Sequence, residues 1–172
     1  MAEPIDLADA KRQLRVRGDS EDQTIRDAIV DARGWIENYT GLILTRREVI
    51  EALPCFTSDI RAWPIASIDS VSYIDHVLAD AELQTFTPLI ARRPARLAAA
   101  SWPSTYSGSA ITVTVTAGFA TADEINAFSP KIMRAMRVLV VGFFNDREGG
   151  DVAKSAIEYA KDLCRSFRCM RV

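Results

Sequence analysis

The chain has 172 residues and a formal net charge of −2; 48% of its residues are hydrophobic and 26% are charged. These are ordinary values for one globular domain, and a chain of this length buries roughly 70% of its unfolded surface without disulfides or metals. The small negative charge argues against a dedicated nucleic-acid binder, because such domains usually carry a basic surplus. The three cysteines are odd in number and do not fit a disulfide framework.

The N-terminus gives no sign of a targeting segment. It is acidic and lacks the apolar core of a signal peptide. The longest apolar run, residues 138–144, is too short to cross a membrane. We therefore expect one soluble, cytosolic domain, residues 1–172, that makes no contact with a membrane.

Two helices are expected in residues 1–41. Asp6 is a candidate N-cap for a short helix over residues 7–14. Ser20 is the expected N-cap of a long helix that ends at Gly41, where glycine tolerates the left-handed C-cap conformation. Apolar residues with helical spacing predict one buried stripe on this long helix: Ile25, Ala28, Ile29, Ala32, Trp35, Ile36 and Tyr39.

Residues 42–118 are expected to form an inserted antiparallel β unit of four to five strands. The clearest strand is 110–118, where Ile and Val alternate with Thr and so face opposite sides. β-branched and alternating residues also predict strands at 43–51 and 67–75, a weaker strand at 83–90 and a short one at 96–99. Residues 76–82 are expected to be a connector.

Residues 129–166 are expected to form two C-terminal helices, followed by a tail at 167–172. Ser129 and Pro130 give a hydroxyl cap and a proline in the first turn, and Gly142 is expected to be a close-packing point. Asp151 is expected to cap the last helix, with five residues pointing inward: Val152, Ala156, Tyr159, Ala160 and Leu163. The fold class is thus α+β: a small bundle of two N-terminal and two C-terminal helices with the β unit inserted between them.

The residues give little sign of catalysis. The single histidine, His76, lies in a connector and is interpreted as a surface residue. Cys164 and Cys169 do not form a CxxC pair and are interpreted as small buried residues. No phosphate-binding loop, nucleophile elbow or zinc-binding helix motif occurs. We expect no catalytic, cofactor-binding or metal site, no cofactor and no enzymatic activity.

Basic clusters and exposed aromatic residues leave two interpretations open. The basic clusters are Arg46-Arg47, Arg92-Arg93-Arg96 and Arg165-Arg168-Arg171. They are either solvated element ends, with the last cluster at a helix C-terminus that favours cations, or contacts for an acidic protein partner. Trp63, Trp102 and Tyr106 either form a contact surface or close the ends of the β unit.

The succession of elements resembles a known family. A short helix is followed by D-x-x-I at the start of a long helix that ends W-I-E-x-Y-T-G, then by a β-rich middle with V-T-V-T-A-G-F, and then by P-x-x-I-x-x-A-M-x-x-L-V-x-x-F-F-x-x-R-E. This order is similar to the head–tail connector proteins of tailed bacteriophages, prophages and gene transfer agents, also called adaptor or head-completion proteins. The C-terminus departs from the ending that relatives often have, proline-tyrosine-arginine. The matching residues are Leu7, Ala8, Lys11, Leu14, Arg15, Val16, Asp22, Ile25, Ala32, Trp35, Ile36, Glu37, Tyr39, Thr40, Gly41, Ala117, Gly118, Pro130, Ile132, Ala135, Leu139, Phe144 and Arg147.

The resemblance implies a structural virion protein. Family members form a ring, usually twelve-fold, below the portal protein; the ring extends the DNA channel and is the platform for a downstream stopper or tail-completion protein. DNA passes through the channel without specific binding. The resemblance places the protein in the cytoplasm of a bacterial host during assembly, and then in the neck of a virion or phage-like particle. It implies a portal-docking tail that includes Arg165, Arg168, Arg171 and Val172, and makes Trp63, Trp102 and Tyr106 candidates for contacts between subunits.

Two other function classes predict different properties. A small DNA-binding or regulatory α+β domain would use Arg92, Arg93 and Arg96, and would bind duplex DNA in a salt-dependent way. A small hydrolase would need a pocket with convergent titratable groups, and the sequence offers no such group.

Overall fold

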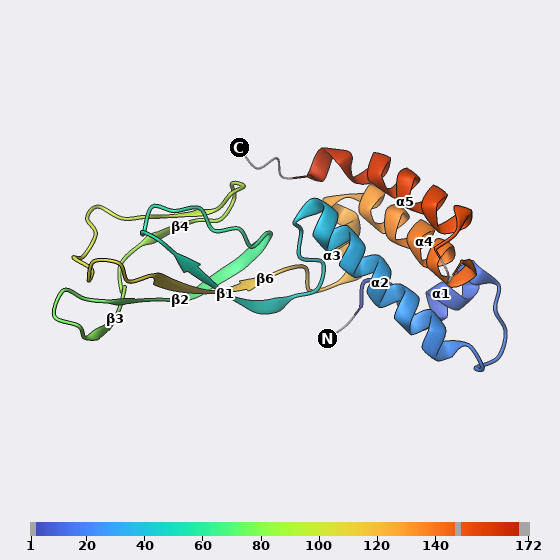
Figure 1. Cartoon of the computed structure of the whole chain (residues 1–172), viewed down its shortest axis with the longest axis horizontal. Coiled ribbons are helices and arrows are strands. Elements are labelled where there is room, and N and C mark those ends of the chain that lie inside the picture. The colour runs from blue at the N-terminus through green and yellow to red at the C-terminus, as the bar shows by residue number, and fades with distance from the viewer. Residues whose placement is uncertain (1–2, 147–148, 169–172) are drawn as a thin grey trace. The chain divides into compact units, whose positions relative to one another are not determined.

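The computed structural model describes residues 3–146 and 149–168, and it divides the chain into two compact units (Figure 1). The helical unit contains residues 1–45 and 119–172. The β unit contains residues 46–118, so it is inserted into the helical unit in the sequence. The expected α+β class is confirmed.

The bounds of the elements are as follows. The helical unit holds α1 (Leu7–Leu14), α2 (Asp22–Thr40), α3 (Ala122–Phe128), α4 (Pro130–Asn145), α5 (Asp151–Cys164) and a short 3-10 helix (Arg165–Phe167). The β unit holds β1 (Arg47–Leu53), β2 (Ile65–Ile74), β3 (Asp80–Glu82), β4 (Thr87–Leu89), β5 (Arg96–Ala98) and β6 (Ile111–Ala117).

The ends of the first two helices follow the predicted chemistry with one exception. The Asp6 carboxylate accepts a hydrogen bond from the Asp9 N–H at 2.6 Å, and Gly41 ends α2 in the left-handed region with φ 69°. The Ser20 cap is wrong, because α2 begins at Asp22 and Glu21 precedes it without a side-chain cap. The connection between α1 and α2 is instead stabilised by the Lys11 ammonium, which forms ion pairs with Asp19 (2.8 Å) and Asp22 (2.6 Å).

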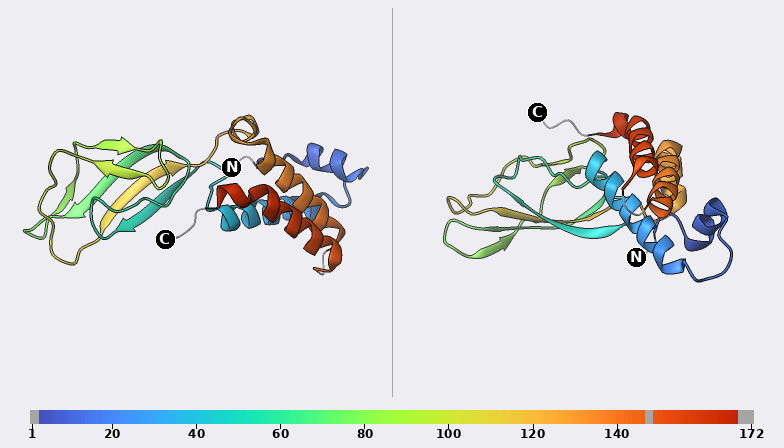
Figure 2. Two further views of the ribbon diagram at one scale, coloured as in Figure 1. Left: turned by 90° about the horizontal axis from the view of Figure 1, so that it is seen from above. Right: turned by 45° about the vertical axis from the view of Figure 1, so that its right-hand side comes forward.

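Helix α4 is the centre of the helical unit. It contacts each of α1, α2, α3 and α5, and Figure 2 shows α5 running alongside it. Seven of its residues are buried: Ile132, Met133, Ala135, Met136, Leu139, Val140 and Gly142. The α2 stripe is only partly as predicted, because Trp35 and Tyr39 are half-buried and stack on each other with ring centroids 5.1 Å apart.

The contact between α4 and α5 depends on Gly142. A Cβ atom at this position would lie 2.5 Å from the Ala156 Cβ, well inside van der Waals contact. The predicted close-packing role of Gly142 is therefore confirmed. The prediction that Val152 and Tyr159 point inward is wrong. Their side chains are 54% and 40% exposed, because small residues fill the inner face of α5.

Asp151 does not cap α5. The helix begins after Gly150, and the cap comes from the preceding helix end. The Asp146 carboxylate accepts hydrogen bonds from the backbone N–H of Gly150 (2.8 Å) and of Ala153 (3.2 Å). A carboxylate that bonds free N–H groups at a helix N-terminus is a cap, although it lies several residues before the helix.

Strand β6 is central in the main sheet, whose strand order is β1-β6-β2-β3 with antiparallel neighbours. Its Ile111, Val113, Val115 and Ala117 are buried, and the alternating threonines face the other side, as predicted. Strands β4 and β5 form a separate antiparallel ribbon.

Several elements differ from the sequence-based expectation. The first strand begins at Arg47 rather than at residue 43, because Leu42 and Leu44 are buried in the helical unit and the Leu44 N–H donates to the Glu37 carboxylate at 2.7 Å. Part of the expected connector 76–82 is strand β3, which pairs with β2. Helix α3 was missed, although Thr121 and Glu124 form a capping box signature: the Thr121 hydroxyl accepts from the Glu124 N–H at 3.2 Å.

Candidate functional site

The predicted aromatic candidates all lie in the β unit but differ in environment. Trp102 is half-buried and stacks on Phe56, with ring centroids 5.0 Å apart and planes 5° apart. Phe56 also meets the edge of Tyr73 at 5.4 Å. Trp63 is half-buried, whereas Tyr106 is 46% exposed. Trp102 thus belongs to the aromatic packing of the β unit, and Tyr106 is the member that a partner can reach.

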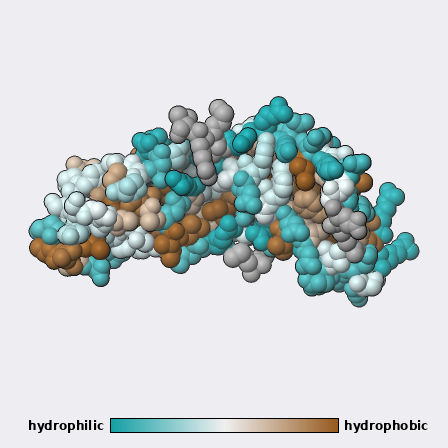
Figure 3. Space-filling view, viewed as in Figure 1, coloured by the Kyte–Doolittle hydropathy of each residue, from teal (hydrophilic) through white to brown (hydrophobic). Residues whose placement is uncertain are grey.

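The hairpin between β2 and β3 presents an apolar tip that sequence reasoning missed. Val77 and Leu78 are each 66% exposed. The Asp75 carboxylate accepts hydrogen bonds from the N–H groups of Val77 and Ala79, both at 2.9 Å, and thereby orders the turn. Figure 3 shows a hydrophobic patch in this region, at the lower left of the view. The sequence feature that could have indicated this exposed apolar tip is the pair of aliphatic residues inside the expected connector.

The predicted docking tail is only partly described. Arg165 forms an ion pair with Asp162 at 2.6 Å, and the Arg168 guanidinium lies 5.5 Å from the centre of the Tyr39 ring. Arg171 and Val172 lie outside the described residues. The structure therefore brings Arg165 and Arg168 to the same end of the helical unit, after α5.

The other basic clusters make contacts within the β unit. Arg96 forms an ion pair with Asp59, and this hydrogen bond lowers the pKa of the Asp59 carboxyl. The Arg46 guanidinium donates to the Gly118 carbonyl at 3.3 Å. These contacts give Arg46 and Arg96 partners inside their own unit.

His76 and the described cysteines lie in separate elements of the chain. His76 is exposed in the β2–β3 turn. Cys164 is buried at the end of α5, and burial raises the pKa of its thiol to about 11. Cys55 is exposed; hydrogen bonds with Ser58 and Thr57 lower the pKa of its thiol. Cys169 lies outside the described residues.

Across residues 3–146 and 149–168, no group of three His, Cys, Asp or Glu side chains could hold a metal ion. None of the helices in the described part of the chain has the length and hydropathy that a bilayer crossing requires.

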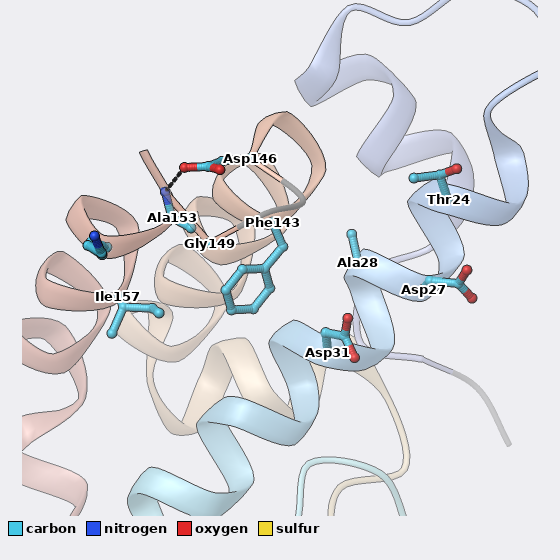
Figure 4. Close-up of a pocket in the computed structure, with 10 residues that line it drawn as sticks. Thr24, Asp27, Ala28, Asp31, Phe143, Asp146, Gly149, Ala153 and Ile157 are labelled. Carbon is cyan, nitrogen blue, oxygen red and sulfur yellow. Dashed lines mark hydrogen bonds between the residues drawn. The ribbon is translucent and has the colours of Figure 1, made fainter. Parts of the chain in front are cut away.

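A groove of about 300 Å³ lies in the helical unit between α2, the end of α4 and the start of α5 (Figure 4). We call it the α2 groove. Its walls combine apolar side chains with carboxylates, and none of the residues that line it is a histidine, cysteine or tyrosine: Thr24, Asp27, Ala28, Asp31, Phe143, Asp146, Gly149, Ala153, Lys154 and Ile157. The dashed line in Figure 4 marks the bond between Asp146 and Ala153.

Asp146 contributes to the groove as a structural carboxylate. The hydrogen bonds from Gly150 and then Ala153 lower the pKa of its carboxyl below the ordinary value of 3.8. A depressed pKa in the folded state stabilises the protein above the unfolded pKa, and this contribution is lost as the pH falls below about 4.

Replacing Asp146 is therefore expected to have a pH-dependent effect. Asp146→Asn should lower the melting temperature at neutral pH, and its difference from wild type should shrink as the pH falls below about 3.8. Thermal melts between pH 7 and about pH 3 measure this. The matched control is Asp151→Asn at the cap position that the sequence predicted, which should change the melting temperature less at neutral pH. Equal effects of the two variants would contradict the assignment of Asp146 as the cap.

Comparison with solved structures identifies the class of fold. The chain is similar to proteins in three structures of gene transfer agent (GTA) particles: "Neck of empty GTA particle computed with C6 symmetry" (TM-score 0.74, 21% identity, covering 100% of this chain and 94% of that chain), "Virion of native gene transfer agent (GTA) particle" (0.77, 21%, 98% and 91%) and "Neck of native GTA particle computed with C12 symmetry" (0.70, 20%, 94% and 89%). At these identities the likeness shows the shared fold, a helical unit with an inserted β unit. A search of curated proteins gave no match.

A family model then gives the particular resemblance. Residues 4–87 match the family described as "Phage gp6-like head-tail connector protein". The match spans α1, α2 and the first part of the β unit. It confirms the resemblance to head–tail connector proteins that the order of elements indicates, and with it a structural connector role.

Proposed function

We propose that this chain is a subunit of an oligomeric ring in the neck of a phage or gene-transfer-agent particle. The ring binds below the portal protein, extends the DNA channel and offers its far side to a stopper or tail-completion protein. The observation that carries this proposal is the match of residues 4–87 to a head–tail connector family, together with the fold found in particle necks. The role requires no covalent chemistry, and assembly takes place in the host cytoplasm.

The charge of the chain suits a DNA channel. Its net charge of −2 gives little electrostatic attraction for phosphates, so DNA can move through without being held. Salt-dependent retention of duplex DNA by the isolated chain would instead favour a DNA-binding domain.

The candidate contacts are assigned by exposure. We propose that Tyr106 and Trp63 contact a neighbouring subunit. Trp102 instead supports the packing around Phe56. The segment from Arg165 and Arg168 through Arg171 to Val172 is proposed to dock on the portal.

Truncation separates docking from folding. Removal of residues 168–172 should leave the melting temperature nearly unchanged, because Arg168 is exposed and its described contact is to the half-buried Tyr39 ring. The same truncation should weaken binding to a purified portal ring by roughly tenfold or more, since charged contacts to a partner would be lost. Calorimetry and sedimentation with the portal measure the two effects. Unfolding of the truncated protein would show that the tail belongs to the core and would contradict the docking assignment.

A further inference from the structure

We propose that neighbouring subunits join head to tail through the helical unit, with a basic face of α4 and α5 from one copy seated on the α2 groove of the next. This inference rests on the proposed ring function and names the two surfaces that would build the ring. The partner is a second copy of this chain.

The first surface is an outward face of α4 and α5, defined by Lys131, Arg134, Arg137, Val152 and Tyr159, which we call the basic face. The three cations recur every third residue on α4, so they share one side of the helix, and all are exposed. None of them forms an ion pair within residues 3–146 and 149–168.

The basic face also offers apolar area. The Arg134 guanidinium lies 5.6 Å from the centre of the Tyr159 ring, which is 40% exposed. Val152, about two turns earlier on α5 and so on the same side of the helix, is 54% exposed. Aromatic and arginine side chains are enriched at protein interfaces, and the basic face exposes both, with Val152 adding apolar area.

The second surface is the α2 groove. Asp27 and Asp31 are one turn apart on the exposed side of α2, and neither forms an ion pair with another described residue. Lys154 at the rim lies 3.7 Å from Asp151, so it already has an anionic partner. Phe143 adds an apolar wall. The groove therefore combines an apolar wall with uncompensated negative charge.

The two surfaces lie on different sides of the helical unit. On α5, Lys154 and Ile157 line the groove, whereas Val152 and Tyr159 belong to the basic face. Val152 is two residues before Lys154, and Tyr159 is two residues after Ile157. A step of two residues is a rotation of about 200° around a helix axis, so the two sets of side chains point to opposite sides of α5. One subunit therefore cannot bring its own basic face onto its own groove, but a second copy can.

Complementary charges on two different patches of the same chain specify a head-to-tail contact. Such a contact is heterologous, and it builds a ring when the rotation from each subunit to the next closes on itself. Opposite potentials also speed the encounter and fix the register of the two faces. The neck structures that share this fold were computed with C6 and C12 symmetry, the kind of arrangement such a contact produces.

Charge reversal of each surface tests the contact. R134E/R137E reverses the basic face and D27K/D31K reverses the groove, while R17E, in the exposed turn before α2, is the matched control. Ring formation is followed by sedimentation velocity and negative-stain microscopy, at high protein concentration and on purified portal rings. Circular dichroism and thermal melts check folding; if a reversal unfolds the chain, R134Q/R137Q and D27N/D31N replace it in the same assay.

We expect each reversed variant alone to assemble at least roughly tenfold less well than wild type, and R17E to assemble like wild type. An equal mixture of R134E/R137E and D27K/D31K should regain rings, because each variant then meets a neighbour of opposite charge. A chain carrying both reversals should also regain them.

Three results would overturn the inference. The first is that both reversed variants form rings as well as the wild type does. This result would leave the ring function intact and place the contact elsewhere. The second is loss of rings without recovery in the mixture. The third is retention of rings by R134E/R137E together with loss of low-salt binding to duplex DNA, which would mean that the basic face meets nucleic acid. Failure of the wild type itself to form rings, even on the portal, would instead contradict the proposed function.

Discussion

Leu139→Ala is expected to lower the free energy of unfolding by about 2–5 kcal/mol, the range for a leucine removed from a packed core. Leu139 is fully buried in α4, the helix that contacts α1, α2, α3 and α5. The substitution removes apolar contacts and leaves a cavity that surrounding helices can fill only partly. Urea denaturation monitored by circular dichroism measures the change.

Val138→Ala is the matched control, because Val138 is the preceding residue of α4 and is half-exposed. We expect it to lower the free energy of unfolding by less than about 1 kcal/mol, since fewer contacts are lost and alanine favours the helix. Similar losses for the two variants would contradict the central place of α4 in the core.

Two glycine substitutions are expected to change stability in opposite directions. Gly142→Ala should lower the free energy of unfolding by about 1–3 kcal/mol, the cost of overpacking, because the new Cβ would lie 2.5 Å from the Ala156 Cβ. Gly34→Ala, within α2, should raise it by up to about 1 kcal/mol, since no atom lies within 4 Å of the added Cβ and alanine favours a helix.

Both glycines are inside helices, so helix propensity alone predicts stabilisation at both positions. Only the contact between α4 and α5 makes the signs differ. Equilibrium unfolding of the two variants decides: stabilisation by Gly142→Ala would mean that the helices can separate without cost. A double variant with Ala156→Gly should recover part of the stability that Gly142→Ala loses, because it removes the opposing methyl group.

Local chemistry made the helix ends of this chain largely predictable. Asp6, Gly41 and Ser129 act where the sequence placed them, because a cap bonds backbone groups only a few residues away. The cap of α5 was misassigned to Asp151 since the true acceptor, Asp146, reaches forward from the end of another helix. A turn of this kind depends on tertiary packing, which spacing rules do not capture.

Burial on the helices was predictable where the pattern was dominated by aliphatic residues. Trp35 and Tyr39 fit the spacing of the α2 stripe, yet they stack on each other at the half-exposed edge. On α5, Ala156 and Ala160 suffice for the buried face, so the larger Val152 and Tyr159 remain outside. The spacing of apolar residues predicts which side of a helix is buried. It does not predict how much of that side the neighbouring helices cover.

The candidate surfaces were harder to predict than the fold. The exposed Val77 and Leu78 were assigned to a connector because a turn tip has no periodicity. The α2 groove joins residues more than one hundred positions apart, such as Asp27 and Phe143, so no motif marks it. Surfaces that serve assembly are defined by what remains uncovered after folding, and this is a property of the packed structure.

The central claim is that the chain acts as a ring-forming connector below the portal. The most direct measurement is electron microscopy of the purified protein incubated with portal rings. The account predicts a second, closed ring of this chain stacked coaxially on the portal, with the channel left open. Subunits that stay monomeric and never bind the portal, at any protein concentration tested, would contradict it.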